Sequence, residues 1–177
     1  MNRKQVLGIA TALVLSITLI GCGNKEKADT AEEKKEADAV STASIVDTAQ
    51  GFLDAAGKDG TWIIAVTQDI TTDQKIVVEG QFTRRDEIYR KIALYAQDED
   101  RDVTDRYTLT APKLTIRSEN TRIQGGTFVG DVYVEANKFH VYNGKVEGII
   151  YFAKEEYKDS FSLQEGGGVT GELKVLE

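Results

Sequence analysis

Residues 128–134 read Phe-Val-Gly-Asp-Val-Tyr-Val, residues 146–152 read Val-Glu-Gly-Ile-Ile-Tyr-Phe, and residues 169–175 read Val-Thr-Gly-Glu-Leu-Lys-Val. All three follow the pattern apolar-x-Gly-x-apolar-x-apolar, and their glycines are 18 and then 23 residues apart. A shorter match, Val-Glu-Gly-Gln-Phe, lies at residues 78–82. Repetition of this kind is typical of structural units that stack on one another.

The alternation inside each repeat predicts short strands, because apolar residues at every second position of a strand lie on one face. A coil cannot bury its own inward row, so neighbouring coils must stack and share a core. The longer spacing fits a coil with an extra loop at residues 153–159, which are rich in Lys and Glu. We therefore expect a mainly β fold, a short right-handed parallel β-solenoid. The alternative is an antiparallel β-sandwich, in which alternation and glycine turns also occur.

One amphipathic helix is expected at the start of the folded part. Residues 44–56 carry apolar side chains at helical spacing, with Ser44 as the expected N-cap and Gly57 or Gly60 at the end. Its expected role is to cover one end of the domain. After this segment the apolar period changes to two, which predicts a series of short strands. Residues 86–92 are the one further candidate for a helix.

The N-terminus has the features of an export signal. A basic stretch at residues 2–4 precedes a mostly apolar run at residues 6–20, which is short for a membrane span and typical of a signal peptide. Residues 19–22 read Leu-Ile-Gly-Cys, which resembles the lipobox of bacterial lipoproteins. The resemblance implies cleavage before Cys22 and attachment of diacylglycerol to its thiol.

These features divide the chain into three parts. Residues 1–21 are the expected lipoprotein signal peptide, residues 22–44 a lipidated, charged tether, and residues 45–177 the β-solenoid domain. The tether has Val40 as its one large apolar residue, too little for a core. A transient helix supported by Glu–Lys pairs would also serve as a spacer. The expected location is the extracytoplasmic face of the cell membrane, held there by the lipid anchor.

The repeated segment, about residues 109–177, resembles the short parallel β-helices of bactofilin-type, polymer-forming proteins. Their coils carry Gly-x-apolar-x-apolar units like those quoted above. Proteins of that family are usually cytosolic and lack a lipobox, so the resemblance does not extend to location. An uncapped last coil would present open strand edges and allow self-association. Glu172 and Lys174 would weaken that edge.

Composition excludes several classes of protein. The formal net charge is −7 and the pI is about 4.9, which argue against nucleic acid as a partner. A single cysteine cannot form an intrachain disulfide or a multi-cysteine zinc site. We expect no metal and no cofactor.

Three motifs are weaker than they first look. The glycine-rich residues 166–171 match G-x-G-x-x-G but lack the helix that a dinucleotide site needs after it, so they are expected to be turn glycines. Residues 98–105 space carboxylates as a calcium loop does, but Val103 stands where the loop needs glycine, which favours a solvated acidic loop. Whether it binds calcium stays open. His140, the one histidine, has no Ser or Cys partner nearby in the sequence and is expected at the surface.

The outward positions of the repeats contain tyrosines, and Tyr133, Tyr142 and Tyr151 form the candidate interaction face. The alternative is that Tyr133 and Tyr151 simply stack along the outer wall. The expected function is that of a non-enzymatic, membrane-anchored envelope lipoprotein that meets a protein, a cell-wall glycan or another copy of itself. The alternatives are a carbohydrate-active β-helix enzyme and the substrate-binding lipoprotein of a transporter.

Overall fold

The computed structural model describes residues 43–176. The expected signal peptide, the Cys22 expected to carry the lipid and the expected tether up to residue 42 lie outside this range. Among the described residues, no helix has the length and apolar character that a membrane crossing requires.

Two parallel sheets form most of the molecule. We call them sheet A and sheet B, and in both of them every strand pair is parallel. Sheet A has one strand from each coil: β1 (Ala43–Val46), β2 (Ile63–Val66), β7 (Arg90–Ala93), β11 (Thr121–Gln124), β13 (His140–Tyr142) and β16 (Ser162–Gln164). Sheet B consists of β3 (Ile70–Thr71), β4 (Ile76–Val78), β10 (Thr108–Ile116), β12 (Thr127–Val134), β14 (Lys145–Glu147), β15 (Ile150–Phe152), β17 (Gly168–Val169) and β18 (Leu173–Val175).

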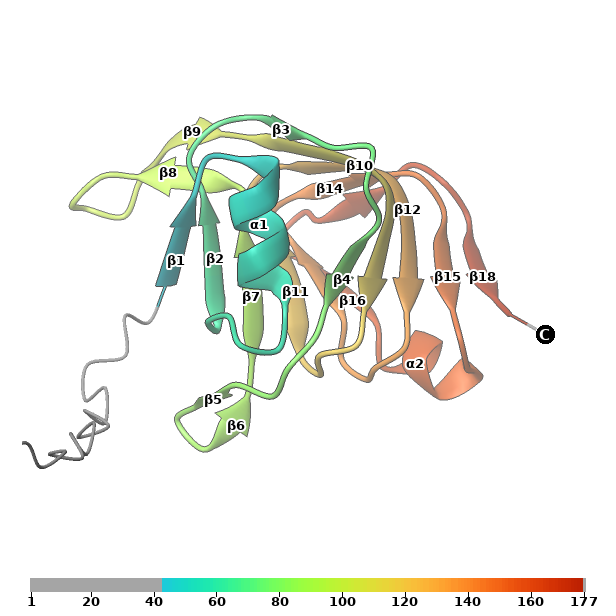
Figure 1. Ribbon diagram of the computed structural model, residues 1–177. Coiled ribbons are helices and arrows are strands. Elements are labelled where there is room, and N and C mark those ends of the chain that lie inside the picture. Colours follow the sequence, from blue (N-terminus) through green and yellow to red (C-terminus); the bar gives the residue numbers. More distant parts are fainter. Residues whose placement is uncertain (1–42, 177) are drawn as a thin grey trace, which may run out of the picture. The chain divides into compact units, whose positions relative to one another are not determined.

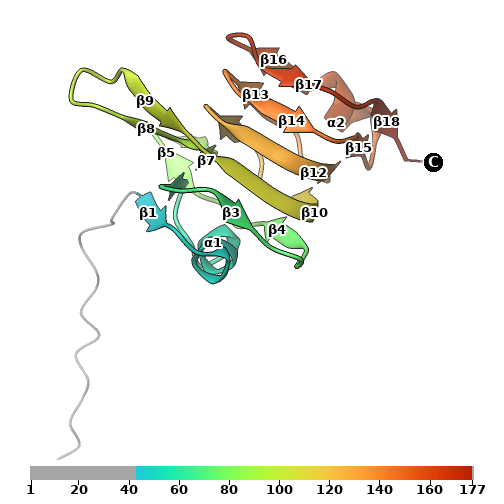
Figure 2. The ribbon, with the colours of Figure 1, turned by 90° about the horizontal axis from the view of Figure 1, so that it is seen from above.

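The chain winds as a right-handed solenoid of about six turns. In Figure 1 it rises along sheet A on the left, crosses the top to sheet B and descends on the right. Figure 2, seen from above, shows that later coils lie progressively farther from the viewer of Figure 1. A clockwise path that recedes is right-handed. The structure thus confirms the parallel β-solenoid and excludes the antiparallel sandwich.

The repeats pair in the register that their alignment predicts. Each of the three apolar positions of the repeat forms one column across the sheet. The first column consists of Phe128, Val146 and Val169, the second of Val132, Ile150 and Leu173, and the third of Val134, Phe152 and Val175. In the first two copies all these side chains are fully buried. The apolar columns of the repeat are therefore the core of the solenoid.

The shorter match at residues 78–82 does not belong to this alignment. Val78 pairs with Ile116, which pairs with Val134, the last apolar position of the repeat. The match at residues 78–82 places Val78 at the first apolar position of the repeat, and the register shows that this alignment is wrong. Gly80 consequently follows β4 and does not correspond to the glycines of the three repeats.

The glycine of each repeat lies where sheet B bends between its two halves. A Cβ atom at Gly148 would overlap the carbonyl oxygen of Gly130, and one at Gly171 would overlap that of Gly148. At Gly130 the obstacle is the carbonyl oxygen of Ala111. The backbones of successive coils approach one another closely at this corner, and only glycine leaves room.

Helix α1 (Ala49–Ala56) covers the N-terminal end of the solenoid, with Phe52 and Ala56 buried. It begins later than expected. Thr48, not Ser44, is the N-cap, and its hydroxyl accepts the Gly51 amide at 3.1 Å. The preceding residues instead form β1, which pairs with β2. The β-branched pair Ile45-Val46 suits this strand. Gly57 ends the helix as expected.

Arg90, from β7, connects α1 to the solenoid through hydrogen bonds. Its side chain is fully buried, and Nη2 donates to the carbonyl oxygen of Ala55 at 2.5 Å while Nη1 donates to that of Glu79 at 3.1 Å. The guanidinium lies 4.1 Å from the centre of the Phe82 ring. Burial lowers the pKa of Arg90 to about 10. A cation here suits the carbonyl end of the helix dipole.

Two antiparallel hairpins project on the sheet A side: β5 (Thr83–Arg84) with β6 (Glu87–Ile88), and β8 (Tyr95–Gln97) with β9 (Val103–Arg106). The helix considered for residues 86–92 is therefore wrong. Arg90 and Ile92 both point inward, which is the two-residue period of a strand. The expected loop at residues 153–159 is present and contains the short helix α2 (Glu155–Asp159).

Candidate functional site

The three candidate tyrosines lie on two different walls. Tyr133 and Tyr151 are partners on sheet B, with ring centres 4.7 Å apart, and Lys113 Nζ lies 3.4 Å above the Tyr133 ring. They stack along the outer wall, as the alternative interpretation held. Tyr142 lies on sheet A, so the structure does not bring the three residues together.

On the outer surface of sheet A, two cations and a histidine occupy one column. Lys91 is the register partner of Arg122, which is the partner of His140, so the three stand on consecutive coils. Aromatic rings and a further arginine surround this column. We call the assembly the cation–aromatic face and define it by three cations and four rings: Arg84, Lys91 and Arg122, with Trp62, Tyr89, Tyr95 and Tyr142.

Arg122 is at the centre of this face. Its guanidinium carbon lies 4.6 Å from the centre of the Tyr142 ring and 5.6 Å from that of Tyr89. Nη2 donates to Gln164 Oε1 at 3.4 Å, whereas the buried Nε has no hydrogen-bond partner in the part of the chain that the structure describes. The two rings therefore hold the guanidinium in place without neutralising it.

Lys91 is positioned by Tyr95. Its Nζ donates to the Tyr95 hydroxyl at 2.7 Å, and Gln124 Nε2 donates to the same oxygen at 3.3 Å. The Tyr95 ring lies against the turn at Gly125, where a side chain would collide with it and where φ is +92°. This glycine is thus required both by its backbone conformation and by the aromatic ring above it.

Arg84 comes from the β5–β6 hairpin and reaches the same aromatic group. It lies 4.9 Å from the centre of the Trp62 ring and 5.9 Å from that of Tyr89, and these two rings are 5.7 Å apart. Burial raises the pKa of Tyr89, while the charges of Arg122 and Arg84 oppose that shift. The Tyr89 phenol is accordingly neutral at physiological pH.

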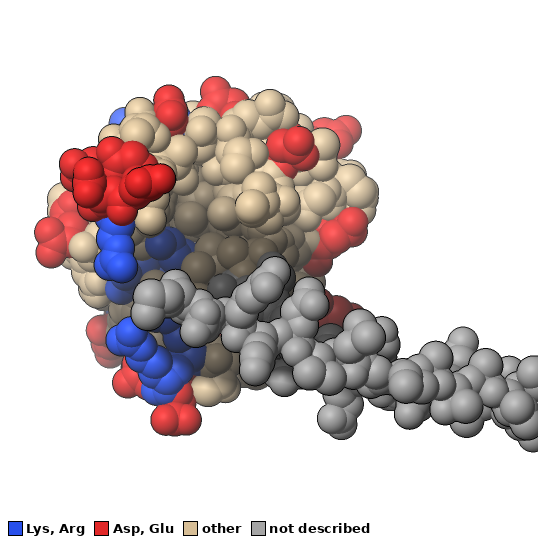
Figure 3. Space-filling model, turned by 90° about the vertical axis from the view of Figure 1, so that its left-hand side faces the viewer, with Lys and Arg blue, Asp and Glu red and all other residues tan. Residues whose placement is uncertain are grey.

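The face is positive in an acidic chain. Within residues 43–176, the ion pairs involve Arg117, Lys145, Lys154, Lys158 and Lys174, and none involves the three cations of the face. Figure 3 views this side of the molecule and shows Lys and Arg gathered in a band between two acidic groups. Cations without carboxylate partners attract anions from solution.

His140 is half-buried at the end of the cation column. Nδ1 lies 2.7 Å from Ser162 Oγ, and Nε2 lies 3.0 Å from Asn120 Oδ1. Burial lowers the pKa of His140, and the charges of Arg122 and Lys138 lower it further. The Ser162 contact could not be predicted, because the two residues are 22 positions apart and meet only as register partners.

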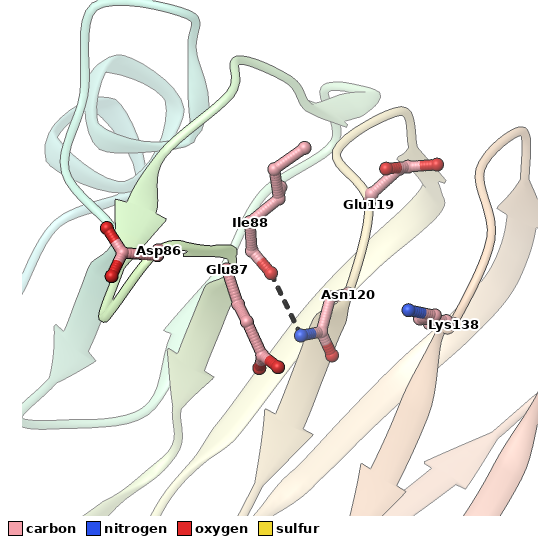
Figure 4. Close-up of a pocket in the computed structure, with 6 residues that line it drawn as sticks. All are labelled: Asp86, Glu87, Ile88, Glu119, Asn120 and Lys138. Carbon is pink, nitrogen blue, oxygen red and sulfur yellow. Dashed lines mark hydrogen bonds between the residues drawn. The ribbon is translucent and has the colours of Figure 1, made fainter.

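A pocket of about 260 Å³ lies where the β5–β6 hairpin meets the turns of the next two coils. Asn120 lines it and donates through Nδ2 to the Ile88 carbonyl oxygen at 2.9 Å. Three carboxylates, those of Asp86, Glu87 and Glu119, also line it, but in Figure 4 they point in different directions. They do not form the converging pair that glycoside hydrolysis uses.

The acidic residues at 98–102 form the tip of the β8–β9 hairpin. Asp98 Oδ1 accepts the backbone amides of Asp100 at 3.1 Å and of Asp102 at 2.9 Å, so this carboxylate closes the turn. In the described part of the chain, no group of three His, Cys, Asp or Glu side chains is placed to hold a metal ion. The glycine-rich residues 166–171 lie in and around β17 and lead into β18, as expected for turn glycines.

Comparisons of the chain with protein families, with curated proteins and with solved structures give no match. The functional interpretation therefore depends on the site itself. Apart from Tyr142, the residues of the cation–aromatic face were missed in the sequence, because the strands of sheet A lack the glycine that marks the repeats. The available signal was the sequence Arg122-Ile123-Gln124, in which polar residues flank an apolar one.

Proposed function

We propose that the protein is a lipid-anchored, extracytoplasmic lipoprotein that binds a partner, an envelope protein or a cell-wall glycan, without catalysing a reaction. The observation that carries the proposal is the cation–aromatic face. Three cations that form no ion pair within residues 43–176 and four aromatic rings are gathered on one wall of the solenoid. Arginine and aromatic side chains are enriched at the centres of binding surfaces.

The anchor is proposed from the sequence. The basic start, the apolar run and Leu-Ile-Gly-Cys occur in the order of a lipoprotein signal. Two acyl chains on Cys22 would hold the protein stably at a membrane surface. Cys22→Ala should release the protein from the membrane fraction. The substitution leaves every charged residue in place, so a difference from the wild type reports the loss of the lipid attachment site. Continued retention would contradict the anchor.

Binding through the face is tested by sedimenting the purified Cys22→Ala chain, which lacks the lipid attachment site, with isolated cell envelopes. In this background the double variant Lys91→Gln with Arg122→Gln should remain in the supernatant under conditions in which the Cys22→Ala parent sediments. Lys113→Gln is the matched control, since Lys113 also lies over a tyrosine ring, on sheet B. Equal sedimentation of all three proteins would contradict a role for the face.

A second candidate function is supported by the chain Ser162–His140–Asn120. A hydroxyl, an imidazole and a side-chain amide oxygen in hydrogen-bond sequence are the parts that nucleophilic catalysis uses. This favours the carbohydrate-active enzyme among the alternatives, as a hydrolase of sugar esters. Ser162 also accepts Gln164 Nε2 at 2.9 Å. A serine-directed phosphonate probe should label wild type and not Ser162→Ala if the enzyme interpretation holds.

Self-association is the third element of the proposal, in line with the resemblance to bactofilin-type β-helices. The last coil exposes apolar side chains that would be buried if another coil followed, with Leu163 at 48% and Leu173 at 41% exposure. Antiparallel pairing of β18 about Leu173 would place Glu172 opposite Lys174 of a second copy. This surface is separate from the cation–aromatic face.

A further inference from the structure

The column of cations on sheet A has the spacing of the solenoid itself. Its two cations, Lys91 and Arg122, stand on consecutive coils with His140 on the next one, and neighbouring strands of a sheet are about 4.8 Å apart. Like charges directly opposite on neighbouring strands disfavour the folded state. No carboxylate within residues 43–176 forms an ion pair with Lys91 or Arg122. A linear ligand with negative charges at intervals would relieve this repulsion along its whole length.

The side chains beside the column indicate which class of ligand carries the negative charges. Tyr95 and Tyr142 present half-buried rings, which can pack on the C–H face of a sugar. Gln124 and Gln164 are register neighbours of Tyr142 in the adjoining column, and their amides can both donate and accept hydrogen bonds. Sugars offer apolar ring faces and hydroxyl groups side by side, and acidic sugars add a carboxylate to each ring.

We propose that the cation–aromatic face binds an acidic glycan, a chain of sugars that carry carboxylate groups, laid across the coils of sheet A. Arg122, held between Tyr89 and Tyr142, is the central carboxylate-binding residue. Its guanidinium matches the two oxygens of a carboxylate, and Lys91 supplies the next charge along the ligand. This inference rests on the proposed function and names the ligand class for the same face.

An acidic peptide is the competing ligand. Extended peptides usually bind by adding a strand to a sheet edge, where backbone groups are unpaired. The column instead runs across the middle of sheet A, because β7, β11 and β13 are each paired on both sides. Recognition here must use side chains, which favours a ligand with hydroxyl groups and ring faces.

The experiment is a calorimetric titration of the full chain with hexagalacturonate, which has one carboxylate per sugar. Maltohexaose is the neutral comparison and hexaglutamate the peptide comparison. We expect hexagalacturonate to bind most tightly, with affinity falling as salt rises from about 0.05 M to about 0.5 M. Arg122→Gln and Lys91→Gln should each weaken binding about ten-fold, whereas Lys113→Gln should leave it unchanged. Thermal unfolding of each variant checks that it is folded.

Three results would overturn the inference. The first is that hexagalacturonate does not bind. The second is that hexaglutamate binds as tightly as hexagalacturonate or more tightly. The third is that Lys113→Gln weakens binding as much as Arg122→Gln and Lys91→Gln do. If hexagalacturonate fails but envelope sedimentation still depends on Lys91 and Arg122, the ligand class is wrong and the binding function stands. If sedimentation also fails to depend on them, the proposed function fails with it.

Discussion

Gly148 shows how closely the coils of the solenoid approach one another. A methyl group at this position would overlap the carbonyl oxygen of Gly130 in the coil before it. We expect Gly148→Ala to lower the free energy of unfolding by about 2–4 kcal/mol, because the backbone of one coil must move. Gly168→Ala is the control, since no atom lies within 4 Å of its added carbon. Urea denaturation measures both, and equal losses would show that the corner is not tightly packed.

His140 makes stability depend on pH in a known direction. Its pKa is lowered in the folded protein, so the unfolded chain binds the proton more readily. The contribution to stability is therefore present at neutral pH and is lost as pH falls below about 6.5. Between pH 7.5 and 5, wild type should lose more unfolding free energy than His140→Gln. The same loss in both proteins would mean that other groups dominate.

At single positions the sequence was informative where a repeat exists. The inward positions of the repeats follow from alternation, and the corner glycines follow from their recurrence. The contacts of His140 and Arg122 could not be predicted, because their partners Ser162, Asn120 and Tyr89 come from other coils at separations that no local pattern records. Only the register of sheet A brings them together.

At the scale of elements, the two faces of strand β12 should respond differently to the same change. Val132 is fully buried in the shared core, whereas Val129 lies on the outer side. Val132→Asp introduces a charge without a partner into the core and should unfold the domain or lower its stability by more than about 4 kcal/mol. Val129→Asp should cost about 1 kcal/mol or less. Thermal melts decide between them, and similar losses would contradict the face assignment.

The helices were harder to predict than the strands. Ile45 and Val46 are adjacent, so they do not distinguish a helix from a strand, and pairing with β2 decides in favour of the strand β1. Residues 86–92 were considered as a helix, but Arg90 lies in the interior of the solenoid, where it donates a hydrogen bond to the carbonyl oxygen of Ala55 at the end of α1. In both segments a long-range contact overrides the local preference.

At the scale of the whole molecule, the solenoid gives its two ends and two walls different surfaces. Helix α1 covers the first coil, whereas the last coil exposes Leu163 and Leu173. Sheet B carries the stacked pair Tyr133 and Tyr151, which are packed against each other. Sheet A carries cations that form no ion pair among the described residues. We infer that sheet A faces the partner.

The most direct test of this account is site-specific photocrosslinking in intact cells. A photoreactive phenylalanine analogue replaces either Tyr142 on sheet A or Tyr151 on sheet B, and the two proteins are otherwise identical. We expect crosslinked envelope material from position 142 and only background from position 151. Equal crosslinking from both positions, or crosslinking from position 151 alone, would contradict the claim that the cation–aromatic face is the binding surface.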